Sequence, residues 1–207
     1  MNIAPVTLEG TRVRMEPLSI ERHFEGLCAI GLDADLWSWT LSKIATRDEL
    51  RKYLDTALEE QTRGVSVPFA TIDRASGTIA GCTRFGTIDR PNRRVEIGWT
   101  WVGRPFQRSH VNTEAKYLML THAFETWGCK RVELKTHENN QRSRNAMLRI
   151  GCTYEGLLRN YQTGETGTRN TAIFSIIDSE WPAVKARLEE MMRREPTRGE
   201  AAIPGAS

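Results

Sequence analysis

Residues 93–120 read RRVEIGWTWVGRPFQRSHVNTEAKYLML, and the other predicted elements are arranged around this stretch. Its first part, Arg93 to Val102, is rich in β-branched and aromatic residues with alternating large apolar side chains, which predicts a strand. Gly103 to His110 contains turn formers and a proline, and it interrupts the strand. A helix then follows, for which Asn112 or Thr113 is the expected cap. The stretch thus predicts a strand, a polar turn and a helix, in that order.

The junction between this turn and this helix is a predicted anion site. A helix N-terminus leaves several backbone N–H groups unpaired, and the positive end of the helix dipole lies there. Phosphate groups bind readily to such an arrangement. Arg104 and Arg108 are expected to add positive charge, and Glu114 is expected in the first turn, where a negative charge is favoured. We therefore expect the junction to hold a diphosphate.

The composition is that of an ordinary globular protein. The 207 residues are 39% hydrophobic and 27% charged, which favours one domain, over residues 1–194, with a substantial core. Residues 195–207 are polar and contain glycine and proline, so a disordered tail is expected there. The formal net charge of +3 is too small to indicate a nucleic-acid partner by itself, although Arg142, Arg144 and Arg149 form a basic helix face.

The sequence contains no recognisable targeting segment and no metal-binding pattern. Neither a secretory signal nor a membrane-spanning run is recognisable, so the cytoplasm is the expected location and no membrane partner is expected. The chain has four widely separated cysteines, Cys28, Cys82, Cys129 and Cys152. Their spacing argues against a zinc site and against a disulfide framework, so we expect no metal. Each is expected to be a small buried apolar residue, with a catalytic thiol as the alternative.

The rest of the chain alternates strands with helices. Strand patterns cover residues 6–18, 65–73, 78–88, 131–136, 154–159 and 168–177. Helical patterns cover 20–30, for which Ser19 is the expected cap, 47–62, which Thr46 begins, and 183–192. A further helix, capped by Asn139 or Asn140, runs to about residue 150. The strand, helix, strand order between 93 and 136 implies a parallel pair with a right-handed crossover. The predicted class is α/β (α+β), with a mixed, mostly antiparallel sheet of about seven strands and helices on both faces.

Two parts of the chain resemble the motifs of the GNAT acyltransferases. Glu96-Ile97-Gly98-Trp99, the turn ending at Gln107, and Val111-Asn112-Thr113-Glu114-Ala115 resemble motif A. Asn140-x-x-Ser143 and Ile150-Gly151-Cys152-Thr153-Tyr154-Glu155-Gly156 resemble motif B. With Arg159 and Glu180-Trp181-Pro182, they are most similar to the RimJ/RimL-like branch. The resemblance covers about residues 6–192 and implies the GNAT fold, in which the sheet is splayed at its centre and acetyl-CoA binds in the opening.

The resemblance also implies which residues hold acetyl-CoA. In the family, the backbone of a Gln/Arg-x-x-Gly-x-Gly/Ala loop binds the pyrophosphate, and the pantetheine arm pairs with the preceding strand like an added strand. The implied cofactor-binding positions are Trp101, Val102, Gln107, Arg108, Ser109, His110, Val111, Asn112, Thr113, Asn140 and Ser143. The matched loop, Gln107 to Asn112, has neither glycine. This departure motivates an alternative function, a GNAT-fold module that senses CoA or binds another anion without catalysis.

The chemistry of acyl transfer to an amine suggests the catalytic candidates. The amine must lose a proton before it attacks a thioester, and the departing thiolate is helped by a proton donor. Glu96 is the candidate base, directly or through water; alternatively it is a solvated carboxylate paired with Arg93 or Arg94. Ser143 and Tyr154 are the candidate acids, although Ser143 also fits an ordinary first-turn serine and Tyr154 a core position.

The residues expected to contact the acceptor amine form no distinctive sequence motif. Trp37 and Trp39 lie in a predicted loop and either cover the core or form the wall of a substrate pocket. His137 follows a strand near the expected opening and is either a substrate contact or an ordinary loop histidine, and Asn140 has helix capping as its alternative role.

Taken together, the resemblance implies an N-acetyltransferase that moves an acetyl group from acetyl-CoA to a primary amine in a ternary complex. The acceptor is a protein N-terminus or a small amine, and an α-amine of a protein or peptide is the first expectation for this branch. Exposed strand edges near the last predicted hairpin favour a homodimer.

Overall fold

Local capping signals set the boundaries of three helices. Ser19 accepts the N–H of Arg22 and begins α1 (Ile20–Gly31). Thr46 and Glu49 form a capping box at the start of α2 (Arg47–Thr62). Asn140 caps α4 (Gln141–Ile150), which ends at the left-handed Gly151. These starts agree with the predictions, because each signal is contained within a few neighbouring residues.

The computed structural model describes residues 1–164 and 167–194, so the tail predicted for 195–207 lies outside the described residues. The described strands form one eight-stranded sheet in the order β1-β2-β3-β4-β5-β6-β8-β7. They are β1 (Leu8–Glu9), β2 (Val13–Pro17), β3 (Val67–Asp73), β4 (Thr78–Asp89), β5 (Arg94–Val102), β6 (Arg131–His137), β7 (Thr153–Gly164) and β8 (Gly167–Ile177). The mixed, mostly antiparallel sheet is confirmed. It has one strand more than expected because residues 6–18 fold into the β1–β2 hairpin.

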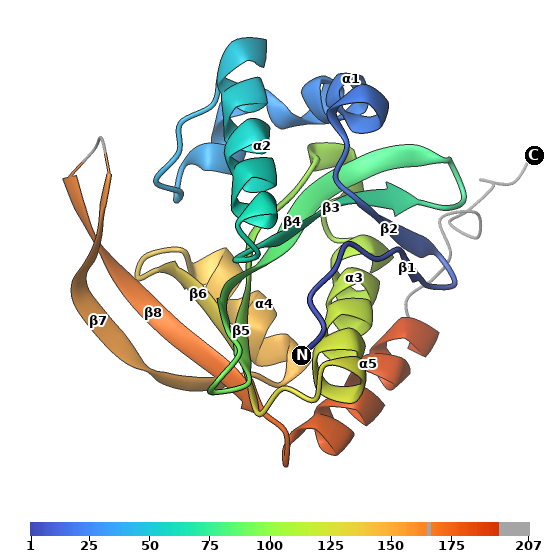
Figure 1. The fold of residues 1–207 in the computed structure, drawn as a ribbon, viewed down its shortest axis with the longest axis vertical. Coiled ribbons are helices and arrows are strands. Elements are labelled where there is room, and N and C mark those ends of the chain that lie inside the picture. Colours follow the sequence, from blue (N-terminus) through green and yellow to red (C-terminus); the bar gives the residue numbers. More distant parts are fainter. Residues whose placement is uncertain (165–166, 195–207) are drawn as a thin grey trace, which may run out of the picture.

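Helices cover both faces of the sheet (Figure 1). On one face lie α1, α2 and the short 3-10 helix η1 (Ala34–Trp37), packed around Leu50, Leu54 and Trp101. On the other lie α3 (His110–Thr121), its π-helical continuation η3 (His122–Thr126), α4 and α5 (Trp181–Arg194). This second core includes Phe85 and Phe174. The sheet therefore separates two apolar layers.

The two halves of the sheet meet at one short parallel pairing. β5 and β6 pair at Arg94↔Arg131, Val95↔Val132 and Glu96↔Glu133. Beyond these pairs, β5 continues to Val102 and β6 to His137, so the two strands separate. In Figure 1, the long β7–β8 hairpin extends to the left of the other strands. The splayed centre predicted for the sheet is confirmed.

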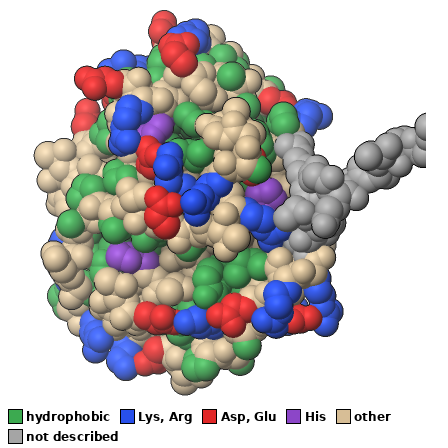
Figure 2. All heavy atoms as spheres, turned by 90° about the vertical axis from the view of Figure 1, so that its right-hand side faces the viewer, with side chains coloured by type: hydrophobic (Ala, Val, Ile, Leu, Met, Phe, Trp, Pro, Cys, Tyr) green, Lys and Arg blue, Asp and Glu red, His purple; other side chains and the backbone are tan. Residues whose placement is uncertain are grey.

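On the face seen in Figure 2, acidic and basic side chains are interspersed, and neither sign of charge forms a large region of its own. Within residues 1–164 and 167–194, no helix has the length and apolarity needed to cross a membrane. Over the same residues, no group of three or more His, Cys, Asp or Glu side chains is placed to hold a metal ion.

Candidate active site

The edge of β5 that faces β6 loses its partner strand beyond Glu96. Among the described residues, no strand pairs with this edge from Gly98 to Val102. Backbone N–H and C=O groups on an unpaired edge can pair with an extended ligand in the manner of an added strand. The wall of the opening is therefore able to hold the amide groups of a pantetheine-like chain.

A β-bulge lies on β5 at this opening. Between the flanking pairs, one residue of β4, Thr83, faces two residues of β5, Trp99 and Thr100. Trp99 has a φ of +51°, which is uncommon for so large a residue. The Trp99 ring lies against Gly86 of β4, where an added Cβ would be 2.4 Å from a ring atom. The Arg84 guanidinium lies 4.2 Å from the centroid of the same ring. The bulge thus turns the backbone of β5 and leaves Thr100 exposed.

The predicted anion site lies at the N-terminus of α3, whose cap is Ser109 rather than Asn112 or Thr113. Ser109 Oγ accepts the N–H of Val111 at 3.4 Å and donates to the carbonyl of Phe106 at 2.6 Å. The second bond ties the cap to the short helix η2, residues 104–106, so the helix starts earlier than predicted.

Helical geometry leaves the N–H groups of Ser109, His110 and Asn112 without a carbonyl partner inside α3. The positive end of the helix dipole lies at the same place. Arg108 is exposed beside it and forms no ion pair within residues 1–164 and 167–194. These features fit a diphosphate.

Two charged residues expected beside this site have structural partners instead. Because α3 starts before the predicted cap, Glu114 lies beyond the first turn, where its buried carboxylate accepts the N–H of Arg12 at 3.0 and 3.2 Å. Arg104 pairs with Asp33 and Asp35 at 2.8 Å each and so fastens η2 to η1. Neither residue adds charge to the anion site.

The loop lacks glycine, and its left-handed residue is Arg108, with a φ of +57°. His110 is helical, and its Nε2 lies 2.9 Å from Asp73 Oδ1 in a buried pair. Burial opposes ionisation of Asp73, but hydrogen bonds involving Ser76 and His110 outweigh it and keep the pKa of this carboxyl below its ordinary value. The imidazole is thereby held against β3.

Gln107 links the two walls of the opening. Its Nε2 donates to the carbonyl of Val102 at 3.0 Å, and its Oε1 accepts from Arg142 Nη1 at 3.1 Å. Val102 ends β5 and Arg142 lies in the first turn of α4. A ligand that pairs with the Val102 carbonyl either shares it with the Gln107 amide or displaces that amide.

Besides His110, three predicted cofactor-binding residues have buried side chains. The exposed fractions are 5% for Trp101 and 0% for both Val111 and Thr113. Contacts of these residues with a ligand in the opening would go through their backbone. Their side chains serve packing, and Thr113 Oγ1 also accepts from Arg149 at 3.2 Å.

The start of α4 brings two further predicted residues together. Asn140 Oδ1 accepts the N–H of Ser143 at 3.1 Å, which is the capping role that the sequence left open. Tyr154 lies on β7 and is 43% exposed, with its ring 5.2 Å from Phe174 and 5.3 Å from the Arg144 guanidinium. Tyr154 is therefore not a core residue, and the acid roles of Ser143 and Tyr154 stay predictions.

Glu96 is the last residue of β5 that pairs with β6, and its side chain lies on the face of the sheet opposite α3. Its carboxylate accepts from Lys135 at 2.9 Å and from Thr87 at 3.0 Å, not from Arg93 or Arg94. Burial disfavours the charge on Lys135, but Glu96 and Glu133 together raise its pKa above the ordinary value. The partner comes from β6, so the local sequence gave no sign of it.

The two tryptophans of the predicted loop have different environments. Trp37 is 2% exposed and donates its Nε1–H to the carbonyl of Gly31 at 2.7 Å, so it covers the core rather than a surface pocket. Trp39 is 42% exposed, and its ring centroid lies 5.1 Å from that of His137. Trp39 and His137, two predicted substrate contacts, are thus brought together at the mouth of the opening.

Lys116, which the sequence analysis did not single out, is buried with an exposed fraction of 6%. Its Nζ donates to Thr100 Oγ1 at 2.8 Å, on the unpaired stretch of β5. No local pattern marks this lysine, because its neighbours in the helix are ordinary helix formers. Its burial results from the sheet packed above it.

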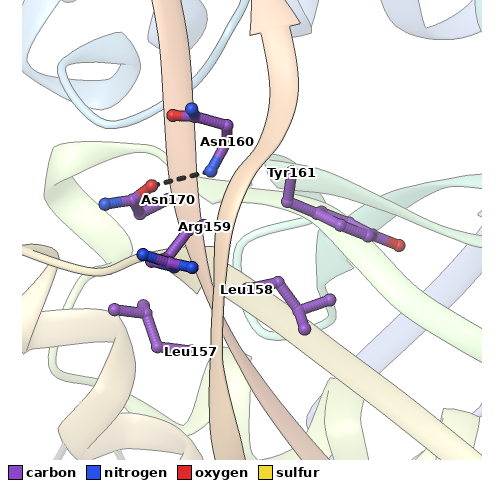
Figure 3. Close-up of a pocket in the computed structure, with 6 residues that line it drawn as sticks. All are labelled: Leu157, Leu158, Arg159, Asn160, Tyr161 and Asn170. Atoms are coloured by element: carbon purple, nitrogen blue, oxygen red, sulfur yellow. Dashed lines mark hydrogen bonds between the residues drawn. The ribbon is translucent and has the colours of Figure 1, made fainter.

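An open hollow of about 700 Å³ lies further out, along β7. Its lining includes Leu157, Leu158 and Tyr161, whose side chains point away from the strand in Figure 3. The N–H of Asn160 donates to Asn170 Oδ1 at 2.8 Å where β7 is irregular. This hollow is separate from the anion site at α3.

Comparison with known proteins agrees with the geometry of the opening. The family model described as "Acetyltransferase (GNAT) domain" matches residues 12–153. YdaF of Bacillus subtilis (strain 168), provisionally named a ribosomal N-acetyltransferase, is 28% identical over 109 residues, which are 53% of this chain and 59% of YdaF. The match thus spans less than two thirds of that relative.

Solved structures give the same picture. A GCN5-related N-acetyltransferase from Brucella melitensis has a TM-score of 0.85 and 34% identity, over 91% of this chain and 86% of that one. Mycobacterium smegmatis RimJ, solved in complex with CoA-disulfide, has the same fold, with a TM-score of 0.77 and 22% identity over 91% and 96% of the two chains. The relative named as a ribosomal N-acetyltransferase supports the predicted RimJ/RimL-like branch. The chain belongs to the GNAT acetyltransferase family.

Proposed function

We propose that the protein acetylates a primary amine with acetyl-CoA as the donor. The observation that carries this proposal is the layout of the opening. An anion cradle lies at the N-terminus of α3, an unpaired strand edge runs along β5, and the Glu96 carboxylate lies where the ladder between β5 and β6 ends. These are the parts needed for a diphosphate, an extended arm and an acceptor amine.

Each part has a defined task in this proposal. Acetyl-CoA supplies an acyl group activated as a thioester. The N–H groups at Ser109 to Asn112, with Arg108, hold the diphosphate, and the backbone of Trp99 to Val102 orients the arm. An N–H on the bulged backbone can donate to the carbonyl oxygen as it gains negative charge. Glu96 takes the proton of the acceptor ammonium, directly or through water.

The acceptor is proposed to be the α-amine of a protein or peptide, with a small amine as the other source of the same group. The names of YdaF and RimJ support the first choice for this branch. Trp39 and His137 are proposed to contact the acceptor, because both lie at the mouth of the opening.

Purified protein, incubated with acetyl-CoA and a panel of peptides and small amines, is expected to release CoA thiol faster than the acceptor-free control. Thiol release and the mass of the acetylated acceptor are the measurements. Peptide N-termini are expected to react faster than lysine side chains, because the α-amine has a pKa of about 8 and is less protonated at neutral pH. Release at the control rate with every acceptor contradicts the proposal.

The loop favours one alternative, a module that binds CoA without catalysis. The family loop has glycines where this chain has His110 and Asn112, and Gln107 already donates to the Val102 carbonyl. Calorimetric titration with CoA separates the two functions. Tight binding without turnover identifies the module, whereas binding with turnover identifies the enzyme.

We also propose that β7 forms the interface of a homodimer. It is the last strand of the sheet, so its outer edge has no partner strand among the described residues, and Leu157, Leu158 and Tyr161 are 40–44% exposed along it. Light scattering is expected to give twice the chain mass for the wild type and one chain mass for Leu158→Glu. The solvated face of α2 offers a control, Thr56→Glu, which is expected to remain dimeric. A wild type that is monomeric at micromolar concentration contradicts this interface.

A further inference from the structure

Lys116 is a buried cation without a carboxylate partner among the described residues. Its Nζ donates to Thr100 Oγ1 at 2.8 Å, and Thr100 Oγ1 lies 2.7 Å from Thr83 Oγ1. Buried lysines are rare unless they are paired, because the ammonium loses its hydration. A methionine of similar length would fill the same space at lower cost. The position of this lysine therefore calls for a role beyond packing.

Lys116 is directed at the floor of the opening. Its partner Thr100 is exposed, although it lies on the face of the sheet that α3 covers, because β6 has already diverged from β5 at this point. Thr100 belongs to the unpaired stretch that holds the pantetheine arm in the proposed function. The ammonium and the hydroxyl thus form a chain of donors that leads from the core to the arm.

The surroundings keep this group able to exchange a proton near neutral pH. Burial lowers the pKa of Lys116 to about 8. The ionisable group that faces it from the start of β7 is Cys152, whose thiol pKa is raised by burial to about 12, so Cys152 stays neutral. On β5 it donates to the hydroxyl of Thr100, which in turn lies 2.7 Å from the hydroxyl of Thr83 on β4. A thiol has an ordinary pKa of about 8.5, close to that of the buried amine.

We propose that Lys116, through Thr100, is the proton donor to the departing CoA sulfur. This inference rests on the proposed acetyl transfer. The acceptor nitrogen forms a bond to the acyl carbon, and the carbon–sulfur bond breaks with its electron pair on sulfur. Thr100 Oγ gives its proton to that sulfur and takes one from Lys116 Nζ. The proton released by the acceptor leaves through Glu96 and solvent, and solvent reprotonates Lys116.

A measurement on bound CoA tests this role without turnover. Thiolate absorbs in the ultraviolet, so a pH titration of the protein–CoA complex gives the pKa of the bound thiol. A protonated amine nearby stabilises the thiolate, and Lys116→Met is expected to raise this pKa by about one unit, a tenfold loss of thiolate at a given pH. Lys52→Met, on the exposed side of α2, is the matched control and is expected to change nothing.

Kinetics provide the second test. Lys116→Met and Thr100→Val are each expected to lower kcat by about tenfold or more, with little change in the KM for acetyl-CoA, whereas Thr100→Ser is expected to retain activity. Wild-type kcat is expected to fall above about pH 8, as the donor loses its proton, and this limb is expected to disappear in Lys116→Met.

Thermal unfolding separates a catalytic loss from a folding loss. The folded-state pKa of Lys116 lies below its unfolded value, so the charged amine destabilises the fold below pH 8, and this cost fades as the pH rises toward 10.5. Lys116→Met is therefore expected to melt at a higher temperature than the wild type at pH 7. A variant with unchanged kcat and unchanged thiol pKa overturns the proposal. If the wild type fails to bind CoA, the proposed function itself fails.

Discussion

Replacing Ser109 with aspartate is expected to weaken CoA binding by about 100-fold while α3 remains capped. Aspartate is as good an N-cap as serine, so the helix start is preserved except for the bond to the Phe106 carbonyl. The new carboxylate lies among the N–H groups proposed to hold the diphosphate. Two like charges about 5 Å apart repel by about 3 kcal/mol at an effective dielectric constant of about 20, which gives this factor. Calorimetric titration with CoA measures it.

The chain contains a matched control for this change. Ser19 is likewise a serine N-cap in extended backbone: it caps α1 through the N–H of Arg22, three residues on, whereas Ser109 accepts from Val111, two residues on. Ser19→Asp is expected to leave CoA affinity within about twofold of the wild type, and both variants are expected to keep the helical circular dichroism signal. Equal affinity of Ser109→Asp and wild type means that the diphosphate lies elsewhere.

Replacing Glu96 with glutamine is expected to lower kcat by about 100-fold, with a smaller effect on the KM for acetyl-CoA. A general base typically contributes a factor of about 100 or more, and the amide keeps the hydrogen-bonding shape of the side chain but cannot take a proton. Steady-state rates at several pH values measure this effect. The deficit is expected to shrink at high pH, where more of the acceptor amine is already neutral.

Glu133 provides the comparison for Glu96. Both carboxylates pair with Lys135, at 2.9 Å for Glu96 and 3.2 Å for Glu133, and both are mostly buried. Like Glu96→Gln, the variant Glu133→Gln removes one carboxylate partner of Lys135, and it is expected to lower kcat by about threefold or less. If the two variants lose activity equally, the effect belongs to the charge on Lys135, and Glu96 is not the base.

The sequence was sufficient for the features that depend on neighbouring residues. The caps at Ser19, Thr46 and Asn140 were predicted because a capping side chain acts on amides two or three residues away. At α3, three polar residues compete for the cap, and Ser109 is selected by its bond to Phe106 in the preceding short helix. That choice depends on how the turn folds back, which periodicity does not report.

The site depends more on contacts across the sheet. Lys135 reaches Glu96 from β6, and Lys116 reaches Thr100 from α3, so neither pair is visible in a local pattern. The strand count also differed by one, because two residues suffice for β1. The positions of the family's two loop glycines are occupied by His110 and Asn112, which are helical, and the left-handed residue of the loop is Arg108, at an energetic cost that asparagine or glycine would not bear.

The brevity of the contact between β5 and β6 has a mechanical consequence. Within the sheet, three residue pairs join two half-sheets, one followed by the N-terminus of α3 and the other carrying Lys135, the ion-pair partner of Glu96. A ligand bound between the two half-sheets contacts both of them and so adds to the few contacts that join them. In the proposed function, bound acetyl-CoA therefore sets the distance between β5 and β6 on the acceptor side. Donor and acceptor binding are then coupled by the width of this opening, without a relay of side chains.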